Sequence, residues 1–109
     1  MSKYEIFEQM ENNVVDWGYS RGILDGVPAT QKRKLKQYQK TEEEVDELYT
    51  AIKLENREEA IDAIGDIMVT LIMQTRLWNT DLYECLNQAY DVINKRTGRM
   101  VDGIFVKDK

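Results

Sequence analysis

This sequence of 109 residues contains no histidine, a single cysteine and a single proline, and each absence excludes a class of structure or chemistry. Without histidine there is no Ser-His-Asp or Cys-His nucleophile system and no histidine-ligated zinc site. The lone Cys85 forms no intrachain disulfide, which predicts a reducing compartment, the cytoplasm, or the host cytoplasm if the protein is viral. One proline and only six glycines favour long helices.

Long apolar runs and an excess of basic residues are also missing. The apolar segments are too short and too interrupted to span a membrane, and the N-terminus is polar, so we expect no membrane association. The net charge of −5 argues against stable nucleic-acid binding. With 20 acidic residues and no histidine, any catalysis must use carboxylates, amines, hydroxyls or a hard cation held by oxygen ligands.

Helical periodicity predicts one domain, residues 1–109, with an all-α fold. Ser2 and Asn56 are predicted N-caps, Pro28 suits the first turn of a helix, and Gly98 suits the position just after one. The tail alternates around Asp102-Gly103, which indicates a short C-terminal β-hairpin or an extended tail. We therefore expect an antiparallel bundle of four to five helices, the first four at about 2–17, 28–55, 56–78 and 80–97.

The apolar residues of these helices predict an oligomer. The third helix is apolar on nearly every side from Ile64 to Met73, except at Asp66, which is typical of a helix buried in a bundle or a subunit interface. Four short helices enclose only a small core, so we expect a homodimer or homotetramer. Cys85 is expected to be a small buried hydrophobe. The second helix is expected to pack through Leu35, Tyr38, Val45, Leu48 and Ile52.

Two acidic clusters stand out against this pattern. Asp62 and Asp66 lie one helical turn apart within the run DAIGDIMVTLIM, where an Asp is costly unless something compensates for its burial. Upstream lies the cluster Glu43-Glu44-x-x-Glu47. The simplest interpretations are an Asp66 that hydrogen-bonds a neighbouring helix and a solvated acidic face with a Lys40–Glu44 pair.

A different interpretation follows if the short connection between the two helices makes an antiparallel hairpin. The line of Glu44 and Glu47 would then face the line of Asp62 and Asp66, and four converging carboxylates cannot all remain ionised without cations. Mg²⁺, with Mn²⁺ as a substitute, suits such an all-oxygen site. Glu43 and Glu59 are then candidates for supporting the metal ligands or acting as a general base.

At these residues the sequence resembles the MazG-like, all-α nucleoside triphosphate pyrophosphohydrolases. The EExxE element matches fully, whereas the second acidic element has two registers, Glu59/Asp62 and Asp62/Asp66. We favour the second register because Asp66 follows a glycine within the apolar run, as the Asp of the family does. The segment from Asn94 to Arg99 is similar to the NKxxxR-type element that follows the last helix of the family.

The resemblance implies Mg²⁺-dependent hydrolysis of (deoxy)nucleoside triphosphates to the monophosphate and pyrophosphate, by a dimer or tetramer. It implies that the catalytic residues are Glu43, Glu44, Glu47, Asp62 and Asp66. It implies that the metal ligands are Glu44, Glu47, Asp62 and Asp66, with Glu59 as an alternative ligand. The triphosphate contacts would be Lys40, Asn94, Lys95 and Arg99. The alternative for Lys95 and Arg99 is that their charges complement the C-terminal pole of a helix dipole.

Two other functions remain open at this point. One is a non-catalytic helical interaction module whose acidic residues only solvate a face. The other is a metal-dependent phosphohydrolase that releases orthophosphate. The identity of the product, pyrophosphate or orthophosphate, distinguishes the second alternative from the pyrophosphohydrolase.

Overall fold

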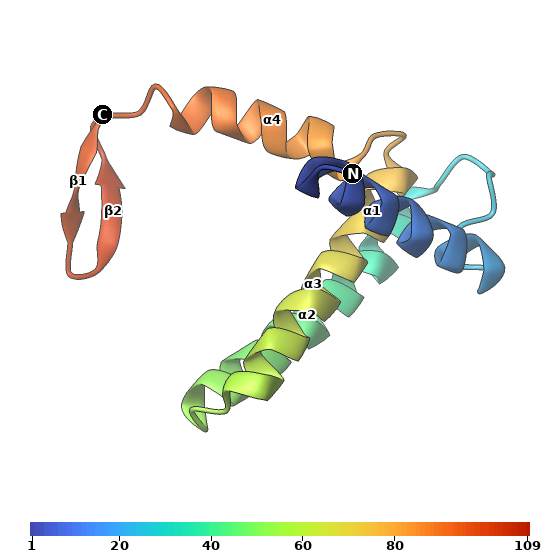
Figure 1. Ribbon diagram of the computed structural model, residues 1–109, viewed down its shortest axis with the longest axis horizontal. Coiled ribbons are helices and arrows are strands. Elements are labelled where there is room, and N and C mark those ends of the chain that lie inside the picture. The colour runs from blue at the N-terminus through green and yellow to red at the C-terminus, as the bar shows by residue number, and fades with distance from the viewer.

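The computed structural model describes residues 1–109 as four helices followed by a two-stranded antiparallel hairpin (Figure 1). The elements are α1 (Lys3–Ser20), α2 (Gln31–Lys53), α3 (Arg57–Leu77), α4 (Leu82–Ile93), β1 (Gly98–Val101) and β2 (Ile104–Lys107). The predicted all-α architecture with a short C-terminal hairpin is confirmed. We find no helix with the length and apolar character that a membrane span requires.

A polar side chain caps the start of every helix by accepting a hydrogen bond from the backbone N–H three residues later. The caps are Ser2, Thr30, Asn56 and Asp81. The predicted caps Ser2 and Asn56 are confirmed. The predicted starts of α2 at Pro28 and of α4 at Thr80 are wrong, because the caps are Thr30 and Asp81, one to two residues later.

The end of α4 also differs from the prediction. The helix stops at Ile93, and Gly98 begins β1 opposite Lys107 rather than following the last helical turn. A Cβ on Gly98 would collide with the backbone of β2, so the glycine serves the close approach of the two strands. Asp102 and Gly103 both have positive φ, 51° and 80°, as a two-residue hairpin turn requires.

The buried core lies where α1 and the loop after it pack on the second half of α3 (Figure 1). It consists of Leu24, Ile72, Met73 and Leu77. Gly18 permits this approach, since a Cβ at that position would lie 2.5 Å from the Met73 sulfur. A partly buried ion pair lies at the edge of this core, with Arg76 Nη2 2.8 Å from the buried Glu11 Oε2. The same oxygen accepts a hydrogen bond from the Leu82 backbone N–H at 3.2 Å. Glu11 thereby joins α1 to α3 and to the first turn of α4.

The antiparallel α2–α3 hairpin buries Ala51 and Ala63 toward its turn and packs through a polar seam toward its other end. Thr41 Oγ1 lies 2.9 Å from Thr70 Oγ1, and the Gln37 amide donates to the Thr70 carbonyl at 3.0 Å. Gln74 donates to the Lys34 carbonyl at 3.1 Å. The apolar side predicted for α2 does not face α3. Leu35, Tyr38, Val45 and Ile52 are all exposed, and Leu48 is half-buried.

The C-terminal third of the chain makes few contacts with the rest. Beyond its first turn, α4 is exposed along its length, and the β-hairpin packs on none of the helices (Figure 1). The expectation that Cys85 is buried is therefore wrong, because the side of α4 that carries it has no neighbour within the chain.

Candidate active site

The α2–α3 hairpin brings three of the predicted carboxylates together. One carboxylate oxygen each from Glu44, Glu47 and Asp66 lie within 4.8 Å of one another. Glu44 and Asp66 are half-buried, and Glu47 is exposed. The hydrogen bond between Thr41 and Thr70 lies about one helical turn from this cluster and fixes the antiparallel pairing of α2 and α3. This pairing places the acidic side of α2 opposite the acidic side of α3.

Glu44 is the residue whose environment is least compatible with an ordinary surface role. Its Oε2 atom is buried and has no hydrogen-bond partner. Burial raises the pKa of the Glu44 carboxyl, and a hydrogen bond to Glu47 and the negative charges of Glu47 and Asp66 raise it further, against the opposing charge of Lys40. A cation held between these carboxylates would offset their mutual repulsion and would give the buried Glu44 Oε2 atom a partner.

The carboxyl group of Asp66 on α3 is in a similarly unfavourable environment. Burial raises the pKa of the Asp66 carboxyl, and the charges of Asp62 and Glu47 and a hydrogen bond with Asp62 add to the effect. Asp62 itself is exposed and touches the cluster through Asp66. Of the two registers considered for the second acidic element, Asp62/Asp66 is the one that places a carboxylate against Glu44 and Glu47.

The two other acidic candidates lie around this cluster. The carboxylate of Glu43 binds Lys40, whose Nζ is 2.8 Å from Glu43 Oε2, so the expected Lys40–Glu44 pair is replaced by a Lys40–Glu43 pair. That hydrogen bond, together with the nearby acidic charges, raises the pKa of Lys40. Glu59 is exposed and lines a cavity of about 520 Å³ together with Glu47 and Asn56, next to the turn of the hairpin.

The structure does not bring the predicted C-terminal phosphate contacts to the carboxylates. Asn94 ends α4, Lys95 follows it, and Arg99 lies on β1; all three are exposed. The β-hairpin that carries Arg99 stands apart from the α2–α3 hairpin (Figure 1). Within one chain, these three residues and the acidic cluster therefore belong to separate surfaces.

The side chains that align the two helices were not identified from the sequence. Gln37, Thr41 and Thr70 form the polar seam beside Glu44, and Thr70 is buried. A usable signal was present, because Gln37, Thr41 and Glu44 recur at helical spacing on one side of α2, and Asp66 and Thr70 do so on α3.

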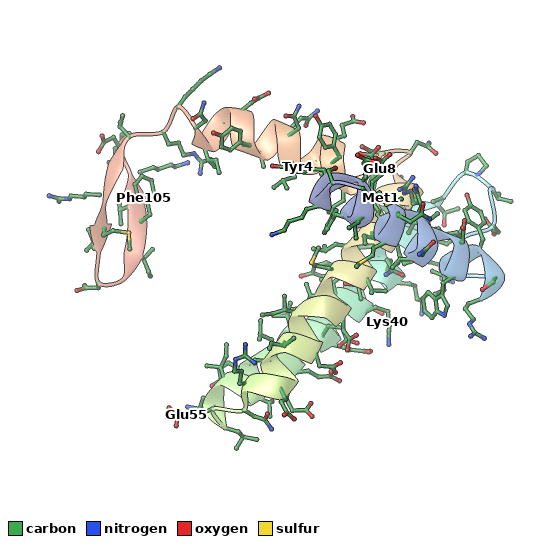
Figure 2. The ribbon with its side chains drawn as sticks, in the orientation of Figure 1. Met1, Tyr4, Glu8, Lys40, Glu55 and Phe105 are labelled. Atoms are coloured by element: carbon green, nitrogen blue, oxygen red, sulfur yellow. The ribbon has the colours of Figure 1, made fainter.

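The donor set fits a hard divalent cation. All available donors are carboxylate oxygens, which Mg²⁺ and Mn²⁺ prefer, and the unpartnered Glu44 Oε2 is an oxygen that a cation would satisfy. Figure 2 shows Lys40 and the side chains that end in oxygen projecting from the same side of the α2–α3 hairpin, between α1 and the turn at Glu55. The arrangement combines carboxylates able to hold a cation with a nearby ammonium group, which suits a phosphate-bearing substrate.

Comparison with protein families supports this interpretation of the site. The model of the phosphoribosyl-ATP pyrophosphohydrolase family matches residues 25–101, which include α2, α3, α4 and β1. Comparisons with curated proteins and with solved structures gave no significant match. Because the family match spans well over half of the sequence and includes both acidic elements, the chain belongs to the phosphoribosyl-ATP pyrophosphohydrolase family, within the MazG-like all-α superfamily of nucleotide pyrophosphohydrolases.

Proposed function

We propose that this protein hydrolyses (deoxy)nucleoside triphosphates between the α- and β-phosphates, with Mg²⁺, and releases a nucleoside monophosphate and pyrophosphate. The observation that carries the proposal is the convergence of Glu44, Glu47 and Asp66 around a buried oxygen without a partner. A non-catalytic module has no need for such an arrangement, since like charges held close together destabilise a fold unless a ligand compensates for them.

In this proposal Glu44, Glu47 and Asp66 hold the metal, and Asp62 supports Asp66. A metal held there would supply positive charge that stabilises the phosphates and would make an attacking water more acidic. Glu59, exposed on the cavity wall next to Glu47, accepts a proton from the attacking water. The water oxygen bonds to the α-phosphorus, and the bond from that phosphorus to the bridging oxygen breaks. Glu43 keeps Lys40 beside the site.

Product analysis tests this proposal directly. The purified protein is incubated with Mg²⁺ or Mn²⁺ and each (deoxy)nucleoside triphosphate, and the products are identified by phosphorus NMR. The name of the matched family makes phosphoribosyl-ATP a second candidate substrate, so it is included. We expect pyrophosphate and a nucleoside monophosphate. Release of orthophosphate as the first product, or no turnover of any of these compounds, would contradict the proposal.

We also infer that the working unit is a homodimer or homotetramer. The accessible surface of the chain is 9021 Å². A compact monomer of 12.8 kDa would expose about 6,300 Å². The excess is comparable with the area that obligate interfaces bury. The exposed apolar side chains include Val45, Ile52, Ile64 and Leu71 on α2 and α3.

A second copy also offers a place for the C-terminal phosphate contacts. The end of α4 and the β-hairpin, which carry Asn94, Lys95 and Arg99, lie apart from the α2–α3 hairpin of their own chain (Figure 1). We propose that they reach the triphosphate bound by a neighbouring subunit, whose α2–α3 hairpin would also cover the exposed apolar side of α4. The cytoplasmic location remains a prediction from the single cysteine.

A further inference from the structure

A basic groove adjoins the acidic cluster along the first half of α2. It encloses about 490 Å³, and its basic lining residues are Lys32, Arg33, Lys36 and Lys40. Glu43 is its only acidic lining residue. In a chain with a net charge of −5, this grouping makes a local positive surface beside the most acidic part of the molecule. Such a surface attracts anions of high charge.

Two of the four cations already have partners. Arg33 binds Asp25 at 3.1 Å and the Ile23 carbonyl at 3.0 Å, so it holds the loop before α2. Lys40 binds Glu43 at 2.8 Å. In contrast, Lys32 and Lys36 form no ion pair anywhere in the chain. Their ammonium groups are therefore free to bind a ligand in the groove.

Lys40 and Lys36 lie on the same side of α2 as the acidic cluster, with Lys40 nearer to it and Lys36 farther away. Lys36, Lys40 and Glu44 follow one another at intervals of four residues, so each lies about one turn, ~5.4 Å, beyond the last. Glu47 is a further turn along the same side. A phosphate chain that begins at the acidic cluster and runs toward the start of α2 would meet Lys40 first and then Lys36.

We propose that this groove binds the pyrophosphate end of the substrate, the β- and γ-phosphates, through Lys36 and Lys40 with Lys32 at its outer edge. This inference rests on the proposed function, because it assigns one end of the same substrate to one side of the same site. The negative charge that develops on the leaving pyrophosphate would lie beside Lys36, whose ammonium has no ion-pair partner, and beside Lys40, which Glu43 holds near the site.

The test measures binding of inorganic pyrophosphate by calorimetry, with Mg²⁺ present, and therefore needs no turnover. The variants are Lys36→Gln and the double variant Lys32→Gln/Lys36→Gln. The matched control is Lys53→Gln, which removes the same charge at the other end of α2, where the ammonium lies over the Tyr49 ring. All three positions are exposed, so the fold should be retained, as a melting curve can verify.

We expect Lys36→Gln to raise the Kd for pyrophosphate about five- to tenfold, the double variant to raise it further, and the control to change it less than twofold. The wild-type affinity should fall as NaCl is added. Equal Kd values for Lys36→Gln and Lys53→Gln would overturn the assignment, even if nucleotides are hydrolysed. Selective weakening without any nucleotide hydrolysis would support the groove as a polyphosphate site and would contradict only the proposed reaction.

Discussion

Asp66 is the residue at which metal binding and folding stability are most directly coupled. In Asp66→Asn the metal-free chain should melt at a higher temperature than the wild type at neutral pH, because one of the facing charges is gone. Mg²⁺ at a hundred times its Kd should stabilise the wild type by about 2.7 kcal/mol, a shift on the order of 10 °C. Most of this shift should be absent from the variant.

Thermal melting with and without Mg²⁺ checks the prediction. Glu42→Gln is the matched control, since Glu42 is exposed and belongs to the same acidic segment but not to the cluster. It should keep the full response to Mg²⁺. A response of Asp66→Asn equal to that of the control would remove Asp66 from the metal ligands.

The pH dependence of stability reports on the same carboxyl groups. The folded-state pKa values of Glu44 and Asp66 are raised above 4.5 and 3.8, so the folded chain binds more protons than the unfolded chain just above those values. Without metal, their contribution to the free energy of unfolding is therefore complete below these values and is lost as the pH rises through the raised pKa values. Urea unfolding in a chelator at several pH values should show a steeper fall for the wild type than for Glu44→Gln/Asp66→Asn; parallel curves would contradict this.

Among the elements, α4 is joined to the rest of the chain at its first turn, where Leu82 packs on the core and Glu11 binds the backbone. Glu11 Oε2 accepts hydrogen bonds from Arg76 on α3 and from the backbone N–H of Leu82 at the start of α4. In Glu11→Ala the guanidinium of Arg76 loses its partner in a largely buried position, which should cost about 2–4 kcal/mol in the free energy of unfolding. Urea unfolding measures this cost, and Glu8→Ala, an exposed change on the same helix, should cost less than about 0.5 kcal/mol. Equal costs would show that the pair does not hold the elements together.

How far the sequence predicts the elements depends on the range of the interactions that form them. Caps and turns are local, so Ser2, Asn56 and the Asp102-Gly103 hairpin could be identified from a few neighbouring residues. The predicted start of α2 and the predicted end of α4 are wrong because proline and glycine suit several positions around a helix terminus. The four-residue recurrence of acidic side chains was likewise sufficient to identify Glu44 and Asp66 as neighbours.

The packing of α2 on α3 could not be obtained in the same way. Apolar periodicity identifies the side of a helix that avoids water, but it does not say which neighbour covers that side. In this chain Val45 and Ile52 are exposed, while the polar residues Gln37 and Thr41 face α3. An argument from periodicity assumes that another helix of the same chain covers the apolar side of α2. If a second copy of the chain covers that side, the argument predicts the wrong contact between α2 and α3.

At the scale of the whole molecule, the exposed apolar surface predicts concentration-dependent assembly. Ile64 on α3 is 50% exposed and lies on the side away from the acidic cluster, so Ile64→Lys should weaken association at least tenfold, because a desolvated charge at an interface is costly. Light scattering after gel filtration measures the oligomeric state. Leu54→Lys makes the same change at the hairpin turn, where Leu54 borders the cavity near Glu59, and should leave assembly intact.

The melting temperature of the wild type should also rise with protein concentration, since dissociation is then linked to unfolding. A wild-type chain that remains monomeric at high concentration and still hydrolyses nucleotides would contradict both the assembly and the role of Arg99 from a neighbouring subunit.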